Sequence, residues 1–163
     1  MRESQIRFIR QQGFSGEQFP DSFYTALMLQ PRIVGCLAAA GVLLQSAWLF
    51  LALSAVLWWS ALVPARNPFD AIYNHVVAPR RGLAPLDTAP KPRRFAAGEA
   101  GTVALAIGMA LFAGATITAW IIEGVFIGGV ISVVFADFCL GAYTYHLLRR
   151  PSPGASAFSA SKG

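Results

Sequence analysis

Two long apolar runs dominate the chain, and both predict helices that cross a membrane. The first run, Ile33–Val63, has 31 residues and no charged side chain. As a single helix it would be about 46 Å long, which exceeds a hydrocarbon core of about 30 Å. Because the polar pair Gln45–Ser46 lies near its middle, we expect two short helices that meet there, with Ala26–Gln30 lengthening the first. One tilted helix is the alternative.

The second run, Phe95–Leu148, predicts a helical hairpin. The pair Glu123–Gly124 is typical of a turn, and it separates Phe95–Ile122 from Gly124–Leu148. Each of these arms exceeds the length of about 20 residues that a helix needs to span a bilayer. Glu123 would then be solvated at the turn.

The two ends of the chain are polar. Residues 1–25 would form an arm, in which Met1–Gln12 is either an amphipathic basic helix on anionic headgroups or a mobile, solvated segment. Small and polar residues dominate residues 149–163, for which we expect a flexible tail.

The connector between the two runs, residues 64–94, is rich in Pro and Arg. Within Phe69–Val77, the apolar residues recur at the spacing of one helical face, formed by Phe69, Ile72, Tyr73 and Val76. We therefore expect a short interfacial helix there. Asn67 would cap this helix, and Pro68 would occupy its first position.

The composition agrees with the pattern of apolar runs. Hydrophobic residues make up 55% of the 163 residues and charged residues 13%, whereas a soluble domain has about 25% charged residues. This composition excludes a soluble enzyme, a disulfide-stabilised secreted module and a disordered chain. We expect one all-α membrane domain, residues 1–163, with four transmembrane helices in two hairpins, residues 26–63 and 95–148.

The distribution of basic residues predicts the orientation of the chain. The net charge is +5, from 13 Lys and Arg against 8 Asp and Glu, and no basic residue lies in either predicted turn. Two hairpins would therefore place every basic residue on one side, and the positive-inside rule makes that side cytoplasmic. We expect a multi-pass protein of a bacterial inner membrane, with both termini in the cytoplasm and no binding to nucleic acid. The predicted cytoplasmic basic face consists of Arg66, Arg80, Arg81, Arg93, Arg94, Arg149 and Arg150.

Small residues recur every four positions in the second run. Such a stripe lets helix backbones approach closely, which drives helix association in lipid. The stripe indicates packing within the hairpin, and a face for self-association is the alternative. Its members are Gly98, Thr102, Ala106, Ala110 and Gly114, followed by Gly124, Gly128, Ser132 and Ala136.

Asp137 is the strongest candidate for a functional residue, because the predicted last helix places it near the centre of the bilayer. A carboxylate at that depth costs about 2.5–3.5 kcal/mol on insertion scales. It could be a proton or ion site, or it could dock a polar group of a partner subunit. The structural alternative is a protonated Asp137 that is hydrogen-bonded to Thr116, Thr118 or a carbonyl group.

Cys139 and His146 are further candidates, and they share one face of the predicted last helix with Tyr143. A metal site needs three or four convergent ligands, so we expect neither a metal ion nor a cofactor. Cys36 would lie near the same side of the membrane as Cys139. The two cysteines are expected to be inert packing residues, with a redox pair as the alternative.

Two segments together resemble the bacterial domain-of-unknown-function family 4395, whose members are small four-helix membrane proteins. The third helix of that family begins with P-x-R-F-A, and its last helix carries F-C-x-G-C followed by an aromatic residue. The resemblance covers about residues 30–148. It implies redox or sulfur-transfer work through the paired cysteines, but Ala142 replaces the second cysteine, so that pair is incomplete here. The matching segments are Lys91-Pro92-Arg93-Arg94-Phe95-Ala96-Ala97 and Asp137-Phe138-Cys139-Leu140-Gly141-Ala142-Tyr143-Thr144-Tyr145.

These observations favour a non-enzymatic function. The leading hypothesis is an accessory or assembly subunit that packs against other membrane protein subunits in the lipid bilayer. One alternative is a membrane thiol-redox or sulfur-handling protein that uses Cys139. The other is a component of a proton or ion pathway that uses Asp137.

Overall fold

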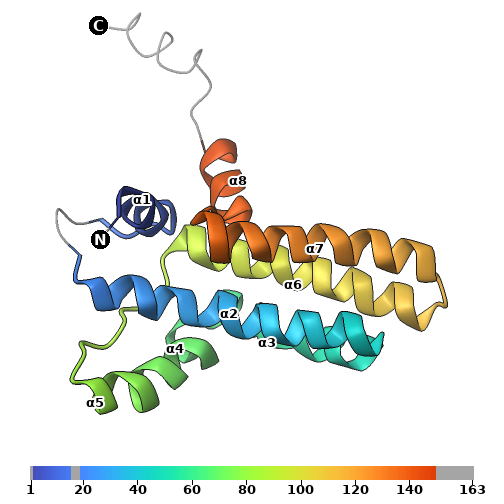
Figure 1. Ribbon diagram of the computed structural model, residues 1–163, viewed down its shortest axis with the longest axis horizontal. Helices are drawn as coiled ribbons and strands as arrows, with labels where there is room; N and C mark the ends of the chain where they lie inside the picture. Colours follow the sequence, from blue (N-terminus) through green and yellow to red (C-terminus); the bar gives the residue numbers. More distant parts are fainter. Residues whose placement is uncertain (1, 16–18, 150–163) are drawn as a thin grey trace, which may run out of the picture.

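The computed structural model describes residues 2–15 and 19–149, and within these residues every regular element is a helix (Figure 1). The expected all-α fold is confirmed. The predicted tail, residues 149–163, lies outside the described residues except for Arg149. The elements are α1 (Glu3–Gln11), α2 (Asp21–Leu44), α3 (Ala47–Leu62), η1 (Pro64–Arg66), α4 (Pro68–Ile72), η2 (Tyr73–Val77), α5 (Ala78–Arg81), α6 (Lys91–Phe112), α7 (Thr116–Ala136) and α8 (Leu140–Leu148).

Helices α2 and α3 form the first hairpin, and the predicted break at Gln45–Ser46 is confirmed. Gln45 ends α2 in the left-handed region at φ 45°, and the Ser46 side chain caps α3 by accepting a hydrogen bond from the Leu49 N–H at 3.4 Å. The first helix is longer than expected, because it begins at Asp21. Arg32 therefore lies exposed in the middle of α2 and not near its start.

Helices α6 and α7 form the second hairpin, but the predicted turn at Glu123–Gly124 is wrong. The chain turns ten residues earlier, at 113–115, where Gly114 adopts φ 71°. Glycine reaches this conformation without steric cost, so Gly114 is the natural turn residue. Glu123 is inside α7 and only 3% exposed. The Gln45 amide nitrogen donates to its Oε2 atom over 3.1 Å, so the turn of the first hairpin supplies the partner that solvent was expected to supply.

The last predicted helix, Gly124–Leu148, is also wrong as a single element. It is interrupted at 137–139, where α7 ends at Asp137 with φ 53° and α8 begins after Cys139. Ser132 makes two hydrogen bonds with the backbone of Phe138 across this break. Its carbonyl accepts from the Phe138 N–H at 3.2 Å, and its hydroxyl donates to the Phe138 carbonyl at 3.1 Å.

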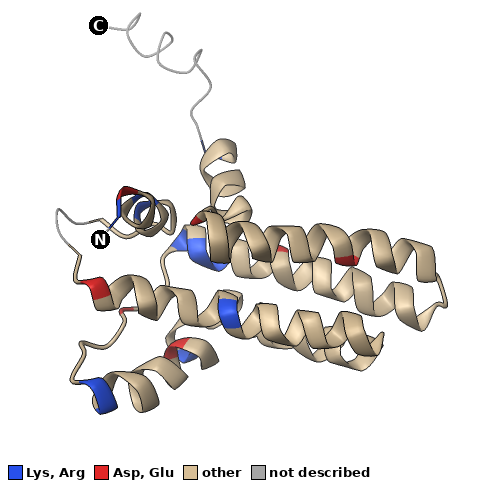
Figure 2. Ribbon diagram, in the orientation of Figure 1, with Lys and Arg blue, Asp and Glu red and all other residues tan. Residues whose placement is uncertain are grey.

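Three helices, α2, α6 and α7, are long and apolar enough to cross a membrane, and the apolar helix α3 is shorter at 16 residues. Both hairpin turns lie at one end of the molecule, and α1, α5 and α8 gather at the other end (Figure 1). Among the described residues, Lys and Arg are absent from the parts of the helices nearest the turns (Figure 2). The molecule therefore has one basic end and one end without basic residues.

Glycines of α6 allow close contact between the two hairpins. Helix α3 packs along α6, and α2 packs on α7. A Cβ atom at Gly101 would lie 2.9 Å from Trp58 Cδ1, and one at Gly108 would lie 2.8 Å from Leu51 Cδ2. Both glycines of α6 therefore face α3, although neither belongs to the predicted stripe.

The connector contains the predicted helix, with its predicted cap. The Asn67 side chain accepts a hydrogen bond from the Phe69 N–H at 3.0 Å, and Pro68 is the first residue of α4. The helix then passes through the π-helical turn η2 and continues in α5. The expected face is only half buried: Phe69 and Tyr73 are buried, whereas Ile72 and Val76 are exposed.

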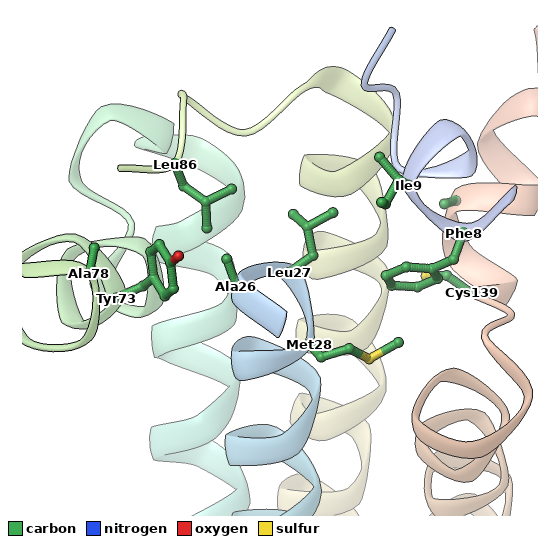
Figure 3. Close-up of a cluster of buried hydrophobic side chains, with 10 residues drawn as sticks. Phe8, Ile9, Ala26, Leu27, Met28, Tyr73, Ala78, Leu86 and Cys139 are labelled. Carbon is green, nitrogen blue, oxygen red and sulfur yellow. The ribbon is translucent and has the colours of Figure 1, made fainter. Parts of the chain in front are cut away.

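The amphipathic segment expected at Met1–Gln12 is a helix, α1, and it is packed against the protein. Phe8 is 1% exposed and Ile9 is fully buried. Figure 3 shows the Phe8 ring beside Cys139, in the same buried cluster as Met28 of α2. The alternative of a mobile, solvated arm is therefore wrong for this segment.

Candidate functional site

Asp137 accepts hydrogen bonds through both of its carboxylate oxygens. The Ser4 hydroxyl of α1 donates to Oδ2 at 2.8 Å, and the Tyr24 hydroxyl of α2 donates to Oδ1. The expected partners Thr116 and Thr118 are wrong, because both lie at the opposite end of α7. The carboxylate joins α1 and α2 to the break after α7.

Gln11 of α1 contacts the other two candidate residues, Cys139 and His146. Its side-chain amide makes two hydrogen bonds with the backbone of Cys139, accepting from the N–H and donating to the carbonyl, each at 3.0 Å. Its own carbonyl oxygen lies 2.9 Å from His146 Nε2. Helix α1 thus contacts all three candidate residues, Asp137 through Ser4 and both Cys139 and His146 through Gln11.

The Cys139 thiol is buried, and burial raises its pKa above the ordinary value of 9.0. The N–H groups of Ala142 and Gly141 act in the opposite direction without reversing the shift. Cys36 is exposed on α2, and both cysteines are free. Within residues 2–15 and 19–149, no three His, Cys, Asp or Glu side chains are grouped to hold a metal ion.

Arg93 was expected on a solvated basic face, but it is buried. It is 6% exposed and forms an ion pair with Asp70, with 2.6 Å between Nη2 and Oδ1. The same nitrogen donates to the Gln30 side-chain oxygen at 3.1 Å, and Asn67 donates to the Asp70 carboxylate at 3.0 Å. This network ties α6 to α2 and to the start of α4.

The remaining arginines of the predicted face differ in exposure. Arg66, Arg80, Arg81 and Arg149 are exposed. Arg94 is half-buried and donates to the Ala61 carbonyl at 2.9 Å, whereas Arg150 lies outside the described residues.

The predicted small-residue stripe does not form one interface. Gly98 faces α3, where a Cβ atom would lie 3.6 Å from Ala61 Cβ. Gly124 and Gly128 face outward, because a Cβ atom added to either would have no heavy atom within 4 Å. Thr102, Ala106, Gly114 and Ala136 are exposed, and Ala110 and Ser132 are half-buried.

A cavity of about 190 Å³ lies between α2, α6 and α7, next to Cys139. Its walls are mainly apolar, and polar side chains gather at one end: Gln12, Gln30, Arg93 and Glu99. Among the described residues, Glu99 Oε2 is the one buried side-chain nitrogen or oxygen without a hydrogen-bond partner. This oxygen reaches the α8 backbone, because a Cβ atom at Gly141 would lie 2.7 Å from it.

A model of the family "Domain of unknown function (DUF4395)" matches residues 26–150. The chain belongs to this family. In this member of family 4395, the matched region contains the cavity-lining helices α6 and α7. It also contains the three candidate residues that α1 contacts, whereas α1 itself lies before the matched region. No curated protein and no solved structure matches the chain.

Sequence reasoning missed the two features that organise this site of the family 4395 member. The Arg93–Asp70 pair joins residues 23 positions apart, and Gln11 contacts a residue 128 positions away. The adjacent basic residues around Arg93 indicated membrane orientation and gave no sign of burial. The motif residue Gly141 was a usable signal, because its missing side chain leaves room for Glu99.

Proposed function

We propose that this protein is a non-enzymatic accessory subunit of a larger complex in a bacterial inner membrane. The observation that carries the proposal is the outward face of α7. Gly124 and Gly128 lie there four residues apart, and a Cβ atom at either position would have no heavy atom within 4 Å. Small residues at this spacing allow a second helix to approach closely in lipid.

The glycines, and not the apolar side chains beside them, distinguish a partner helix from lipid. Ile117, Ile121 and Val125 are 64–76% exposed, which contact with lipid alone would explain. Contact with lipid does not explain the glycines. Gly destabilises a helix by about 1 kcal/mol relative to Ala, and contact with fluid acyl chains gives no compensating stabilisation. A helix from another chain, packed over Gly124 and Gly128, would offset that cost.

The test is purification of the full chain from its native membrane in mild detergent. We expect one identified membrane protein to co-purify in fixed stoichiometry, and we expect Gly128→Leu to lose it. Ile121→Leu, a conservative change on the same exposed helix, is the matched control and should retain it. Recovery of this chain alone, or equal recovery of the partner with both variants, would contradict the proposal.

We further propose four membrane-spanning helices, with both hairpin turns on the outer side of the membrane and both termini in the cytoplasm. The absence of Lys and Arg near the turns, among the described residues, supports this orientation. Helix α2 reaches spanning length if the residues before Arg32 also enter the bilayer, with the Arg32 side chain extending to the surface.

Labelling in intact cells tests this orientation. A single cysteine at the exposed residue Ala113 of the second hairpin turn, in a chain whose Cys36 and Cys139 are replaced by serine, should react with a membrane-impermeant maleimide. A single cysteine at the exposed residue Asp87 of the connector should not react. The opposite pattern, or labelling at both positions, would overturn the topology.

A further inference from the structure

We infer that the cavity between α2, α6 and α7 is a binding site for a hydroxyaromatic ring, with the ring hydroxyl hydrogen-bonded to Glu99. The inference is independent of the proposed subunit function. It rests on the size of the cavity, the chemistry of its walls, the unpartnered Glu99 oxygen and the position of the opening.

The size and walls of the cavity fit one substituted aromatic ring. Its volume is about 190 Å³, and an engineered apolar cavity of about 150 Å³ is known to take benzene. Phe126, Val130 and Val133 of α7 supply apolar walls, together with Val34 of α2 and Val103 of α6. An apolar cavity of this kind gains from being filled, because its lining atoms otherwise lack contacts.

The polar end selects the headgroup. Glu99 Oε2 is buried without a partner, which is costly for a carboxylate oxygen. A hydroxyl group can satisfy it in either protonation state, because a hydroxyl both donates and accepts. An anionic headgroup is disfavoured by the Glu99 carboxylate in the same lining.

The opening of the cavity allows a tail to leave it. Val125 is 65% exposed and Leu140 is 52% exposed, although both line the cavity. They lie on α7 and at the start of α8, so the cavity meets the outer surface of the bundle between these elements. The ring can therefore belong either to a membrane-dissolved hydroquinone with an apolar tail or to a free phenol.

The experiment titrates 4-fluorophenol or fluorobenzene into the full chain in lipid nanodiscs and follows binding by fluorine NMR. We expect 4-fluorophenol to bind about tenfold more tightly than fluorobenzene, as a hydrogen bond to a charged group would give. Glu99→Leu should remove this preference while fluorobenzene still binds. Equal binding of both probes to the unmodified chain would mean that water or nothing satisfies Glu99, and would overturn the inference.

A matched pair of glycine variants locates the bound ring. Gly129 lines the cavity and Gly128 does not, and both have open space where a Cβ atom would stand. Gly129→Leu should abolish binding of both probes, and Gly128→Leu should leave it unchanged. Val133→Phe is a second way to fill the cavity if Gly129→Leu fails to fold. Binding that survives in a folded, filled variant would place the probe elsewhere and refute the site.

Competition distinguishes the two sources of the ring. Decylhydroquinone and hydroquinone are compared for displacement of bound 4-fluorophenol. Stronger displacement by the tailed compound identifies a membrane hydroquinone, and equal displacement identifies a free phenol; both outcomes support the site. Failure of both compounds to displace the probe would overturn it.

Discussion

The buried Arg93–Asp70 ion pair yields a stability prediction that the structure makes quantitative. The Asp70 carboxylate accepts from Arg93 Nη1 at 3.2 Å, from Arg93 Nη2 at 2.6 Å and from Asn67 at 3.0 Å. Asp70→Ala removes all three contacts and leaves the guanidinium buried, with the Gln30 oxygen still accepting from it. Removing one partner of a buried ion pair costs about 3–5 kcal/mol. At about 2–4 °C per kcal/mol, this corresponds to a fall in Tm of roughly 6–20 °C.

The assay is thermal unfolding of the purified chain, followed by tryptophan fluorescence in one detergent for all variants. Asp87→Ala is the matched control, because Asp87 is an exposed carboxylate of the same connector. We expect its free energy of unfolding to change by less than about 0.5 kcal/mol, as is usual for surface substitutions. Equal effects of Asp70→Ala and Asp87→Ala would show that Arg93 is hydrated in the protein and would refute the reasoning.

A double variant separates the ion pair from simple loss of packing. Replacing both partners of a buried pair by apolar residues is often neutral, because no charge remains buried alone. Asp70→Leu with Arg93→Met should therefore recover most of the stability that Asp70→Ala loses. If the two substitutions instead destabilise additively, the cost does not arise from an uncompensated charge.

Three further predictions concern α1, the cysteines and the contact between α3 and α6. Gln11→Ala should remove the two hydrogen bonds to the Cys139 backbone and speed amide hydrogen exchange in α1 and α8; unchanged exchange would count against the contact. In detergent, the exposed Cys36 should react with maleimide before the buried Cys139. Because burial raises the pKa of the Cys139 thiol above its ordinary value of 9.0, the labelling rate of Cys139 should still be rising at pH 9. Gly101→Ala should destabilise the chain by about 1–3 kcal/mol, since a Cβ atom there would lie 2.9 Å from an indole carbon of α3, whereas Gly128→Ala should not lower its stability.

Features with local causes could be predicted from the sequence. The break at Gln45–Ser46 follows from a polar pair inside an apolar run that is too long for one span. The cap at Asn67 follows from the preference of its side chain for the first free N–H groups of a helix. In both cases the deciding interaction lies within three residues along the chain, as in the 3.0 Å hydrogen bond from the Phe69 N–H to Asn67.

Features with distant partners could not be predicted. Glu123 was predicted to lie at a solvated turn. Its burial could not be foreseen, because Gln45, which donates to it, lies 78 positions earlier in the chain. The hydrogen bond from the Ser4 hydroxyl to Asp137 could not be foreseen either, because Ser4 lies 133 positions away. The actual turn at 113–115 has a glycine but no charge, so its only signal was weaker than that of Glu123–Gly124.

The second apolar run contains three acidic residues, and two of them receive hydrogen bonds from other parts of the chain. A carboxylate removed from water needs hydrogen-bond donors. Asp137 receives them from Ser4 and Tyr24, and Glu123 receives one from Gln45. The Oε2 atom of Glu99 is buried, yet no side chain or backbone group of the described residues donates to it. The hydroxyl group that we propose for the adjacent cavity, which Glu99 lines, would supply the donor that the described residues do not.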